Sequence, residues 1–279
     1  MTMYNRDSFS QKTGILIRNF FLLLVCFLIF APLVVMISNA FKIDSEIYDF
    51  PMQIIPKTPT LENFFQLADR FPLYVWNSVK LTFIIVFVQL ITAATGAYAF
   101  SKLQWKGRNI IFMFYIASIM VPVHSIIIPQ FLIIRNMGLY NTHMALILTG
   151  AFTAFGTFLI KQYFMTIPGS FSEAAYIDGA NDFIIFFRIV LPLSKPVFAT
   201  QIILSFRYFW NDFFSPLIYI TSQRLKTLPL GMSDFTNEFY TYKGPQMAAS
   251  FISIIPVMII FLAAQKYFVQ GVASTGLKG

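Results

Sequence analysis

Few side chains in this sequence have the types needed for catalysis or metal binding. The chain of 279 residues holds two histidines, His124 and His143, and one cysteine, Cys26, which lies within an apolar run. Two separate histidines provide too few ligands for a metal site. An enzyme site would need a converging nucleophile, base or ligand set, and the sequence offers none. We therefore expect no catalytic residue and no metal.

The sequence also lacks the usual motif for binding ATP. No GxxxxGK[ST] segment occurs, and that loop is the common cradle for nucleotide phosphates. The formal net charge is +8, which could indicate nucleic acid, but the basic residues cluster at the ends of apolar segments. That distribution is typical of anchoring on the cytoplasmic side of a membrane. We expect neither a cofactor in this chain nor a nucleic-acid partner.

One polar stretch, residues 170–192, has a spacing that could serve to dock a partner protein. It reads Glu173-Ala174-Ala175, three residues, Gly179, nine residues, then Ile189-x-Leu191-Pro192. Two apolar runs flank it, so the stretch is a loop between membrane segments. We interpret it either as a knob that fits a groove on a soluble partner or as an ordinary loop helix stabilised by its own cap.

The local structure of this loop can be predicted from its residues. Ser170 stands three residues before Glu173 and forms a capping-box pattern, which predicts a helix that starts just after Pro168. Gly179 can end this helix in a left-handed conformation. Asn181 can cap a second helix, which Pro192 would stop. The loop should therefore form two short helices joined by a glycine turn.

The elements that position this loop are apolar runs. The chain is 57% hydrophobic and 11% charged, with a mean hydropathy of +0.68, which is rare for a soluble domain. Six runs approach the roughly 20 residues that cross a hydrocarbon core, and lipid requires each to be helical. The expected spans are residues 15–37, 78–100, 109–128, 144–164, 197–220 and 247–268. We predict an all-α integral membrane protein with a single transmembrane domain over residues 1–279.

Positive charges predict the orientation of these spans. The N-terminal tail carries Arg6, Lys12 and Arg18, and the loop after the second span carries Lys102 and Lys106. Such residues favour the cytoplasmic side. The loop after the first span is acidic and suits the outside. Both termini and the loop of residues 165–196 are therefore expected in the cytoplasm.

The spacing of residues 173–192 resembles the EAA loop of permease subunits of binding-protein-dependent ABC importers, and every fixed position of that pattern is present. Further stretches resemble the carbohydrate class, in particular its maltose-type second permease subunit. These stretches are Asn77-Ser78, Ala97-Tyr98-Ala99-Phe100, Asp178-Gly179-Ala180, Leu191-Pro192-Leu193-x-Lys195-Pro196, Trp210-Asn211, Thr227-Leu228-Pro229-Leu230-Gly231, Gln265-Lys266-Tyr267-Phe268-Val269-Gln270-Gly271 and Lys278-Gly279. The resemblance extends from about Asn77 to the C-terminus.

The resemblance implies the type I importer permease fold in the bacterial cytoplasmic membrane. It implies a second homologous permease subunit, two ATPases that bind ATP and Mg, and an extracytoplasmic sugar-binding protein. ATP binding would move the coupling loops together and open the pathway outward. The implied contacts to the ATPases are Glu173, Ala174, Ala175, Asp178, Gly179, Ile189, Leu191 and Pro192 in the loop, with Lys278 and Gly279 in the C-terminal tail.

Polar residues inside the apolar runs could line a solute pathway. Arg207 falls near the middle of the fifth expected span, where a charge is costly and should face the protein interior. Asn211 shares its helical face, and Trp210 could stack on a sugar ring. A structural pair with the partner subunit explains Arg207 equally well. Gln89, Thr153 and Gln201 are expected to make hydrogen bonds between helices.

The loop of residues 221–246 is long for a helix connection and lies outside in the predicted topology. By resemblance it contacts the binding protein, with Asn237, Tyr240 and Tyr242 as candidate residues. An ordinary surface loop is the alternative.

Two alternative functions compete with a sugar importer. A permease of the same class for a uronate oligomer or glycerol phosphate fits the same motifs. An ion-coupled secondary transporter would require acidic residues within the spans, and Asp212 is the only one.

Overall fold

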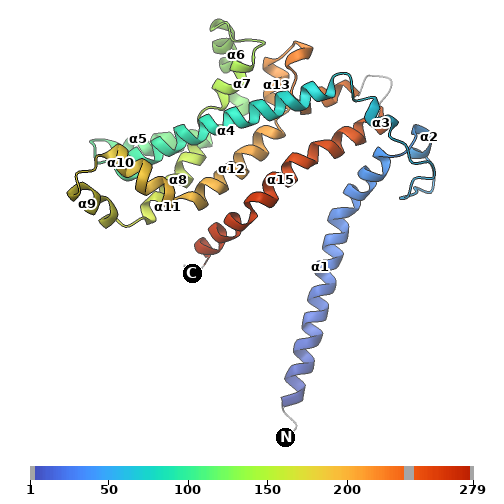
Figure 1. Ribbon diagram of the computed structural model, residues 1–279, viewed down its shortest axis with the longest axis horizontal. Helices are drawn as coiled ribbons and strands as arrows, with labels where there is room; N and C mark the ends of the chain where they lie inside the picture. Colours follow the sequence, from blue (N-terminus) through green and yellow to red (C-terminus); the bar gives the residue numbers. More distant parts are fainter. Residues whose placement is uncertain (1–3, 236–241, 277–279) are drawn as a thin grey trace. The chain divides into compact units, whose positions relative to one another are not determined.

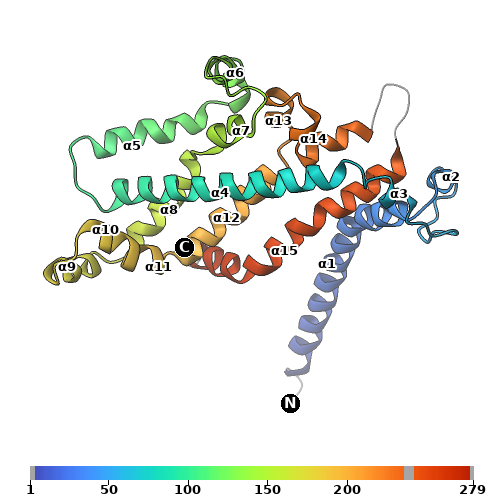
Figure 2. The same ribbon diagram turned by 45° about the horizontal axis from the view of Figure 1, so that its top comes forward.

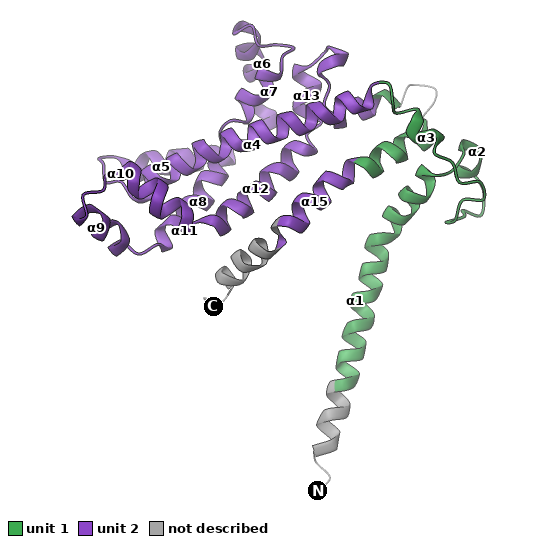
Figure 3. Cartoon of the chain, viewed as in Figure 1, with its two compact units in different colours: residues 1–69, 234–252 green, residues 70–233, 253–279 purple. Residues whose placement is uncertain are grey.

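The computed structural model describes residues 4–235 and 242–276, and every regular element within these ranges is helical. The chain divides into two compact units, which are coloured separately in Figure 3. Unit 1 comprises Met1–Asp69 and Asp234–Ile252, and unit 2 comprises Arg70–Ser233 and Ser253–Gly279.

Unit 1 contains the long first helix and two short ones. Its helices are α1 (Tyr4–Ala40), α2 (Asp44–Ile47), α3 (Glu62–Phe65) and the beginning of α15 (Lys243–Gly276). The Asn63 side chain connects α3 to the end of α1. Its Nδ2 donates to the carbonyls of Ala40 and Lys42, at 3.0 and 2.8 Å. The start of α15 passes close by, since a Cβ at Gly244 would lie 2.2 Å from Asn63 Oδ1. A side chain at 244 would therefore displace this amide.

Unit 2 is arranged around α4 (Phe71–Ser101), which contacts α7, α8, α12 and α14 (Figures 1 and 2). The other α-helices are α5 (Arg108–Ala117), α6 (Ile127–Asn136), α7 (His143–Gly150), α8 (Ala154–Thr166), α9 (Ser170–Ile177), α10 (Asp182–Ile185), α11 (Leu191–Leu193), α12 (Lys195–Trp210), α13 (Phe214–Tyr219) and α14 (Leu228–Met232), followed by the remainder of α15. A π-helical turn covers Phe186–Val190, and 3-10 turns cover Ser118–Met120, Val123–Ile126, Gln223–Leu225 and Ser233–Phe235.

Within the described residues, three continuous helices are long and apolar enough to cross a membrane. They are Lys12–Ala40, Phe71–Ser101 and Lys243–Ala263. Three further candidates are bent pairs, namely Arg108–Met120 with Val123–Asn136 (94°), His143–Gly150 with Ala154–Thr166 (41°), and Asp182–Leu193 with Lys195–Trp210 (76°). The described residues therefore hold up to six spans if each bent pair counts as one.

Three of the expected spans, 109–128, 144–164 and 197–220, are not single helices. The first breaks at Val121 and Pro122, whose ring removes a backbone donor. The second breaks before Thr153, which is extended and caps α8. In the third, α12 ends at Trp210, and Asp212 Oδ1 accepts the Ser215 N–H at 3.1 Å to begin α13. A proline at the first break, and side-chain oxygens that accept backbone N–H groups at the other two, thus compete with helix continuation.

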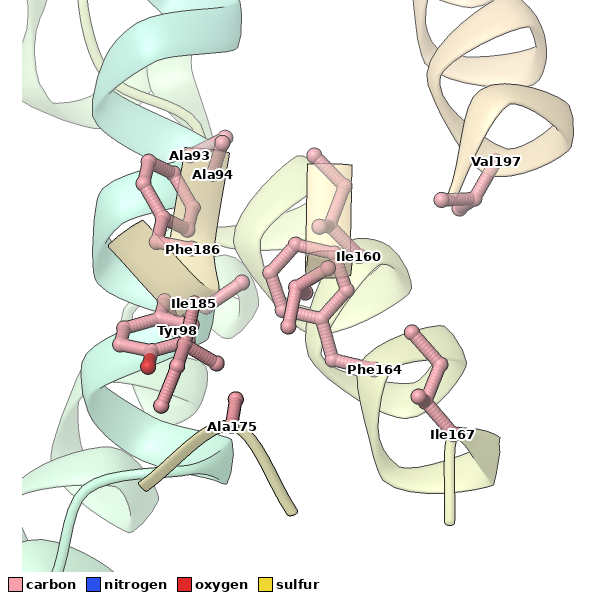
Figure 4. Packing of buried hydrophobic residues seen from close by; sticks show 12 residues of the cluster. Ala93, Ala94, Tyr98, Ile160, Phe164, Ile167, Ala175, Ile185, Phe186 and Val197 are labelled. Carbon is pink, nitrogen blue, oxygen red and sulfur yellow. The ribbon is translucent and has the colours of Figure 1, made fainter. Parts of the chain in front are cut away.

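A buried apolar cluster at the C-terminal end of α4 anchors the loop between α8 and α12 (Figure 4). Its members are Ala93, Ala94, Ala97 and Tyr98 from α4, Ile160, Phe164 and Ile167 from the α8 region, Ala175, Ile185, Phe186 and Val190 from the loop, and Val197 from α12. Figure 4 shows Ala175 and Ile185 beside Tyr98, with Phe164 facing them from α8. We call this set the coupling-end cluster.

A second cluster occupies the N-terminal half of α4. It comprises Leu81, Ile85, Ile134, Ala145, Leu146, Tyr219, Ile220 and Leu230. The 31 residues of α4 extend over about 46 Å at 1.5 Å per residue. This helix therefore holds the loop of residues 165–196 at one end and the segment around α13 and α14 at the other.

Neighbouring alanines in α9 should respond differently to enlargement. Ala175 is buried in the coupling-end cluster, whereas Ala174 is exposed. We expect Ala175→Leu to lower the free energy of unfolding by about 1–3 kcal/mol through overpacking. Ala174→Leu, the matched control, should change it by less than about 0.5 kcal/mol. Thermal unfolding in detergent measures both, and equal effects would contradict this packing.

Candidate functional site

The first helix of the loop does not begin as the sequence predicts. Its N-cap position is Gly169, which already has helical angles (φ −61°, ψ −29°), and no side chain caps it. Ser170 is therefore the first helical residue, and the expected capping box with Glu173 is absent. The reason is that a capping residue needs an extended backbone, while the chain turns helical directly after Pro168. The Glu173 N–H instead bonds to the Gly169 carbonyl at 3.0 Å.

The end of this helix matches the prediction. Gly179 has φ +80°, a left-handed conformation that residues with a Cβ atom rarely adopt. The N–H of Ala180 bonds to the Ala175 carbonyl at 2.9 Å, and the N–H of Gly179 bonds to the Tyr176 carbonyl at 3.0 Å. These two bonds are the Schellman pattern, which satisfies the last carbonyls of a helix.

The second helix also begins as predicted, but it ends later. Asn181 Oδ1 accepts the N–H of Ile184 at 3.0 Å, which makes Asn181 the cap of α10. The helical path continues through the π turn and α11 to Leu193, so Pro192 does not stop it. The Leu191 N–H bonds to the Phe186 carbonyl, five residues back. We attribute the tolerance of proline here to this wider turn, which precedes it.

The residues of the predicted coupling motif divide into two groups. Ala175 is buried in the coupling-end cluster, and Ile189 and Leu191 pack against that cluster. The exposed group consists of Glu173, Ala174, Asp178, Gly179 and Pro192. Ala175, Ile189 and Leu191 therefore hold the loop on α4 and α8, while the exposed positions remain available to a partner. We call the folded segment of residues 169–194 the coupling knob.

Polar contacts fix the coupling knob to the end of α4. Asp182 Oδ1 accepts hydrogen bonds from the hydroxyls of Tyr176 at 2.5 Å and Tyr98 at 3.3 Å. The bond to Asp182 raises the pKa of Tyr176, so this hydroxyl stays protonated and remains a donor. Lys102 Nζ donates to the Ile167 carbonyl at 2.8 Å, and burial lowers the pKa of this lysine. The basic loop after α4 thus lies at the base of the coupling knob.

The coupling knob also carries exposed apolar side chains. Ile177 is 87% exposed, and the others are Phe171, Tyr176, Phe183 and Phe187, each at least half exposed. Phe171, Tyr176 and Ile177 belong to α9, Phe183 belongs to α10, and Phe187 belongs to the π-helical turn that follows α10. Large apolar side chains gathered on a surface commonly mark a binding site for another protein or for a membrane.

The other end of α4 holds the segment of residues 221–228 firmly. Asn77 Nδ2 donates to the carbonyls of Arg224 and Lys226, at 2.9 and 3.0 Å, and Ser78 Oγ accepts the Leu228 N–H at 2.7 Å. Asn141, at φ 55°, accepts the N–H groups of Thr221 and Ser222 through its Oδ1. Nothing in the sequence pattern singles out Asn141, because an asparagine in a left-handed conformation leaves no clear signal.

Of the three candidate residues for binding-protein contact, the described part of the chain includes Tyr242 alone. The Tyr242 N–H bonds to the Phe235 carbonyl at 3.0 Å, and its side chain is exposed. Asn237 and Tyr240 lie outside the described residues, as do Lys278 and Gly279 of the C-terminal tail. Their predicted contacts remain predictions.

Unit 2 carries a partly open cavity of about 720 Å³. Its lining comes from one face of α4, one face of α12, the break between α5 and α6, the break between α7 and α8, and the start of α13. The polar lining residues are Ser78, Thr82, Gln89, Ser118, His124, Gln130, Thr149, Thr153, Gln201, Ser205, Tyr208, Asp212, Ser215 and Thr227. The interruptions in the spans therefore lie where the cavity is, which is where irregular backbone is tolerated in a membrane protein.

A buried hydrogen-bond network joins α4 to α12 beside this cavity. Ser205 Oγ donates to Gln89 Oε1, and Gln201 Nε2 donates to Ser205 Oγ at 2.8 Å. Gln89 Nε2 reaches the Gly150 carbonyl at 3.1 Å. The expectation of interhelical hydrogen bonds is confirmed for Gln89 and Gln201. The Thr153 hydroxyl instead accepts the Gly156 N–H and caps its own helix, while the Thr153 carbonyl accepts the Tyr115 hydroxyl of α5 at 3.2 Å.

The predicted pathway residues on α12 occupy other positions than expected. Arg207 lies in the last turn of α12 rather than mid-span, and its carbonyl accepts the Asn211 side-chain amide at 2.8 Å. Both are exposed, and neither lines the cavity, whereas Tyr208 and Asp212 do. Consecutive residues of a helix point about 100° apart, which separates these faces. A role for Arg207 and Asn211 in a pathway shared with a partner subunit remains a prediction.

Trp210 requires a correction. Its side chain is only 2% exposed, its ring stacks on Phe206, and its Nε1 donates to the Ser253 carbonyl of α15 at 3.0 Å. It therefore packs inside unit 2 and is not available to a solute. No group of three or more His, Cys, Asp or Glu side chains that could hold a metal ion occurs in the part of the chain that the structure describes.

Comparison with known proteins agrees with this architecture. Residues 91–274 match the family described as binding-protein-dependent transport system inner membrane component. The chain is 36% identical to a probable ABC transporter permease protein, YurM, of Bacillus subtilis (strain 168), over 93% of this chain and 87% of that protein. It is 32% identical to the arabinooligosaccharides transport system permease protein AraQ of Halalkalibacterium halodurans, over 91% of this chain and 93% of that protein.

A solved structure has the same fold. It belongs to a bacterial ABC transporter that imports the acidic polysaccharide alginate, with a TM-score of 0.84 and 25% identity over 93% of this chain and 98% of that chain. The family match covers more than half of the sequence, includes the coupling knob, and agrees with the all-helical fold. The chain therefore belongs to the family of inner membrane components of binding-protein-dependent transport systems.

Proposed function

We propose that the chain is the permease subunit of an ATP-driven, binding-protein-dependent importer of sugars or oligosaccharides. In this role it forms half of a translocation pathway together with a second homologous permease. Two separate ATPase subunits bind ATP and Mg, and an extracytoplasmic sugar-binding protein delivers the solute. Support comes from the family match and from the relative named as an arabinooligosaccharide permease. This assignment leaves no support for an ion-coupled secondary transporter.

The observation that carries the coupling role is the construction of the coupling knob. Its apolar motif positions are anchored in the coupling-end cluster, while Ile177 and the exposed motif residues face away from it. A rigid attachment to α4 and α8 would transmit a displacement of the knob to the helices that line the cavity. We propose that an ATPase groove receives the exposed side of the knob.

We further propose that the coupling knob and both termini lie in the cytoplasm. Lys102 contacts the base of the knob, and Lys106 and Arg108 follow it in sequence. Basic residues next to span ends favour the cytoplasmic side. On this view the segment of residues 221–228, fixed at the opposite end of α4, faces the binding protein.

A charge on the exposed face of the coupling knob should block ATPase binding. We expect Ile177→Glu to reduce co-purification of the ATPase at least tenfold, because a carboxylate would be buried in an apolar groove. Stability should not change, since Ile177 is 87% exposed in this chain. The matched control is Ile55→Glu, an 81% exposed isoleucine in the loop between α2 and α3. Equal ATPase recovery with both variants would refute the docking proposal.

The glycine turn of the coupling knob offers a second test. Gly179→Ala should lower the free energy of unfolding by about 1–2 kcal/mol through backbone strain at φ +80°. It should also reduce ATP-driven uptake by misaligning the two short helices. Gly138→Ala is the control, because Gly138 has φ +71° and, as at Gly179, an added Cβ would meet no atom within 4 Å. The control should lose similar stability and retain coupling; loss of coupling in both variants would assign the effect to strain alone.

A further inference from the structure

The cavity in unit 2 is lined with neutral hydrogen-bonding groups. Ser78, Thr82 and Gln89 form a stripe on one face of α4, and Gln201 and Ser205 face it from α12. From Ser78 to Gln89 the stripe extends over roughly 16 Å of helix. Hydroxyl and amide groups donate and accept hydrogen bonds without carrying charge. These five side chains are buried, and Ser78, Gln89, Gln201 and Ser205 already form hydrogen bonds within the protein. The neutral polar lining groups that stay at least partly exposed include Ser118, Thr149, Thr153, Tyr208 and Ser215, and groups of this kind suit a solute with many hydroxyls.

The one formally charged side chain in the described lining of this cavity is negative. Among the described lining residues there is no lysine or arginine, and Asp212 is the one carboxylate. Asp212 Oδ1 accepts the Ser215 N–H at 3.1 Å, so its position is fixed by the start of α13. The nearest arginine in sequence, Arg207, lies off the lining. Two other arginines, Arg70 and Arg224, line a separate hollow of about 330 Å³.

We propose that this cavity admits uncharged, hydroxyl-rich solutes and disfavours anionic ones, with Asp212 as the specificity-determining charge. The inference rests on the proposed function as a sugar permease and narrows its solute class to neutral oligosaccharides. It differs from the acidic polysaccharide named for the solved alginate importer. It also disfavours the alternatives of a uronate oligomer and glycerol phosphate, because each brings a negative charge toward a carboxylate that no lysine or arginine in the lining offsets.

The physical basis is electrostatic. One unit charge about 4 Å away changes the local concentration of an ion roughly fivefold in water, and more where protein excludes water. Neutral hydroxyls do not experience this electrostatic energy, and the partly exposed hydroxyls of the lining offer them hydrogen bonds instead. Selection between neutral and anionic solutes therefore needs no close steric fit.

The test measures the sign of the field inside the assembled transporter. In the complete complex in lipid vesicles, Cys26→Ser removes the only native cysteine and Ser215→Cys places a thiol beside Asp212. Two methanethiosulfonate reagents of similar size, one a quaternary ammonium and one a sulfonate, are compared at low salt. After normalisation to a free thiol in solution, the cationic reagent should react roughly fivefold faster or more. Asp212→Asn, which can still cap α13, should bring the ratio close to one.

Solute protection provides the second measurement. A neutral arabino-oligosaccharide should slow the labelling of Ser215→Cys, and a uronate oligosaccharide of equal length should not. Equal or faster reaction of the sulfonate, or equal protection by the uronate, would overturn the proposed selectivity. If the proposed function as a sugar permease is wrong, the outcome differs. The thiol then keeps its preference for the cationic reagent, but neither solute protects the thiol and neither solute is taken up.

Discussion

The contact between the coupling knob and the C-terminal end of α4 is the interaction on which the rest of the structure depends. Ala175, Ile185 and Val190 are buried against α4 and α8, so small side chains and close packing fix the knob to two membrane helices. Close-packed interiors transmit displacement because they have few voids to absorb it. The same α4 carries the cavity stripe and, further along, Asn77 and Ser78. A movement of the knob would therefore reach the cavity through one continuous helix.

Polar side chains between α4 and α12 set the register of the cavity walls. Hydrogen bonds between membrane helices contribute only about 0.6–2 kcal/mol each, so stability alone is a weak explanation for a buried cluster of Gln89, Gln201 and Ser205. Hydrogen bonds are directional, so these side chains fix the register of α12 against α4. A shift of α12 by one residue would leave the amides without partners. The network thus specifies one arrangement of α4 and α12.

The sequence predicts the helical class, the turn at Gly179 and the cap at Asn181, because glycine and asparagine have strong local preferences at those positions. It fails at Ser170, where the preceding residue is already helical, and at Pro122, where an apolar run conceals a 94° bend. The signal for the cavity was present in the polar residues 201, 205, 208 and 212, which recur at helical spacing. Arg207 gives a stronger sequence signal than these residues, because a charge within an apolar run is conspicuous whatever direction its side chain faces.

The central claim is that α4 connects a coupling knob on one side of the membrane to a fixed outer segment on the other. Cysteines at Ile177→Cys and Thr221→Cys, each exposed and each introduced into a Cys26→Ser chain, test it directly. In cells that lack the ATPase, which would otherwise cover position 177, a membrane-impermeant maleimide should label position 221 in intact cells or right-side-out vesicles. It should label position 177 only in inverted vesicles. Labelling of both positions from the same side would contradict the account.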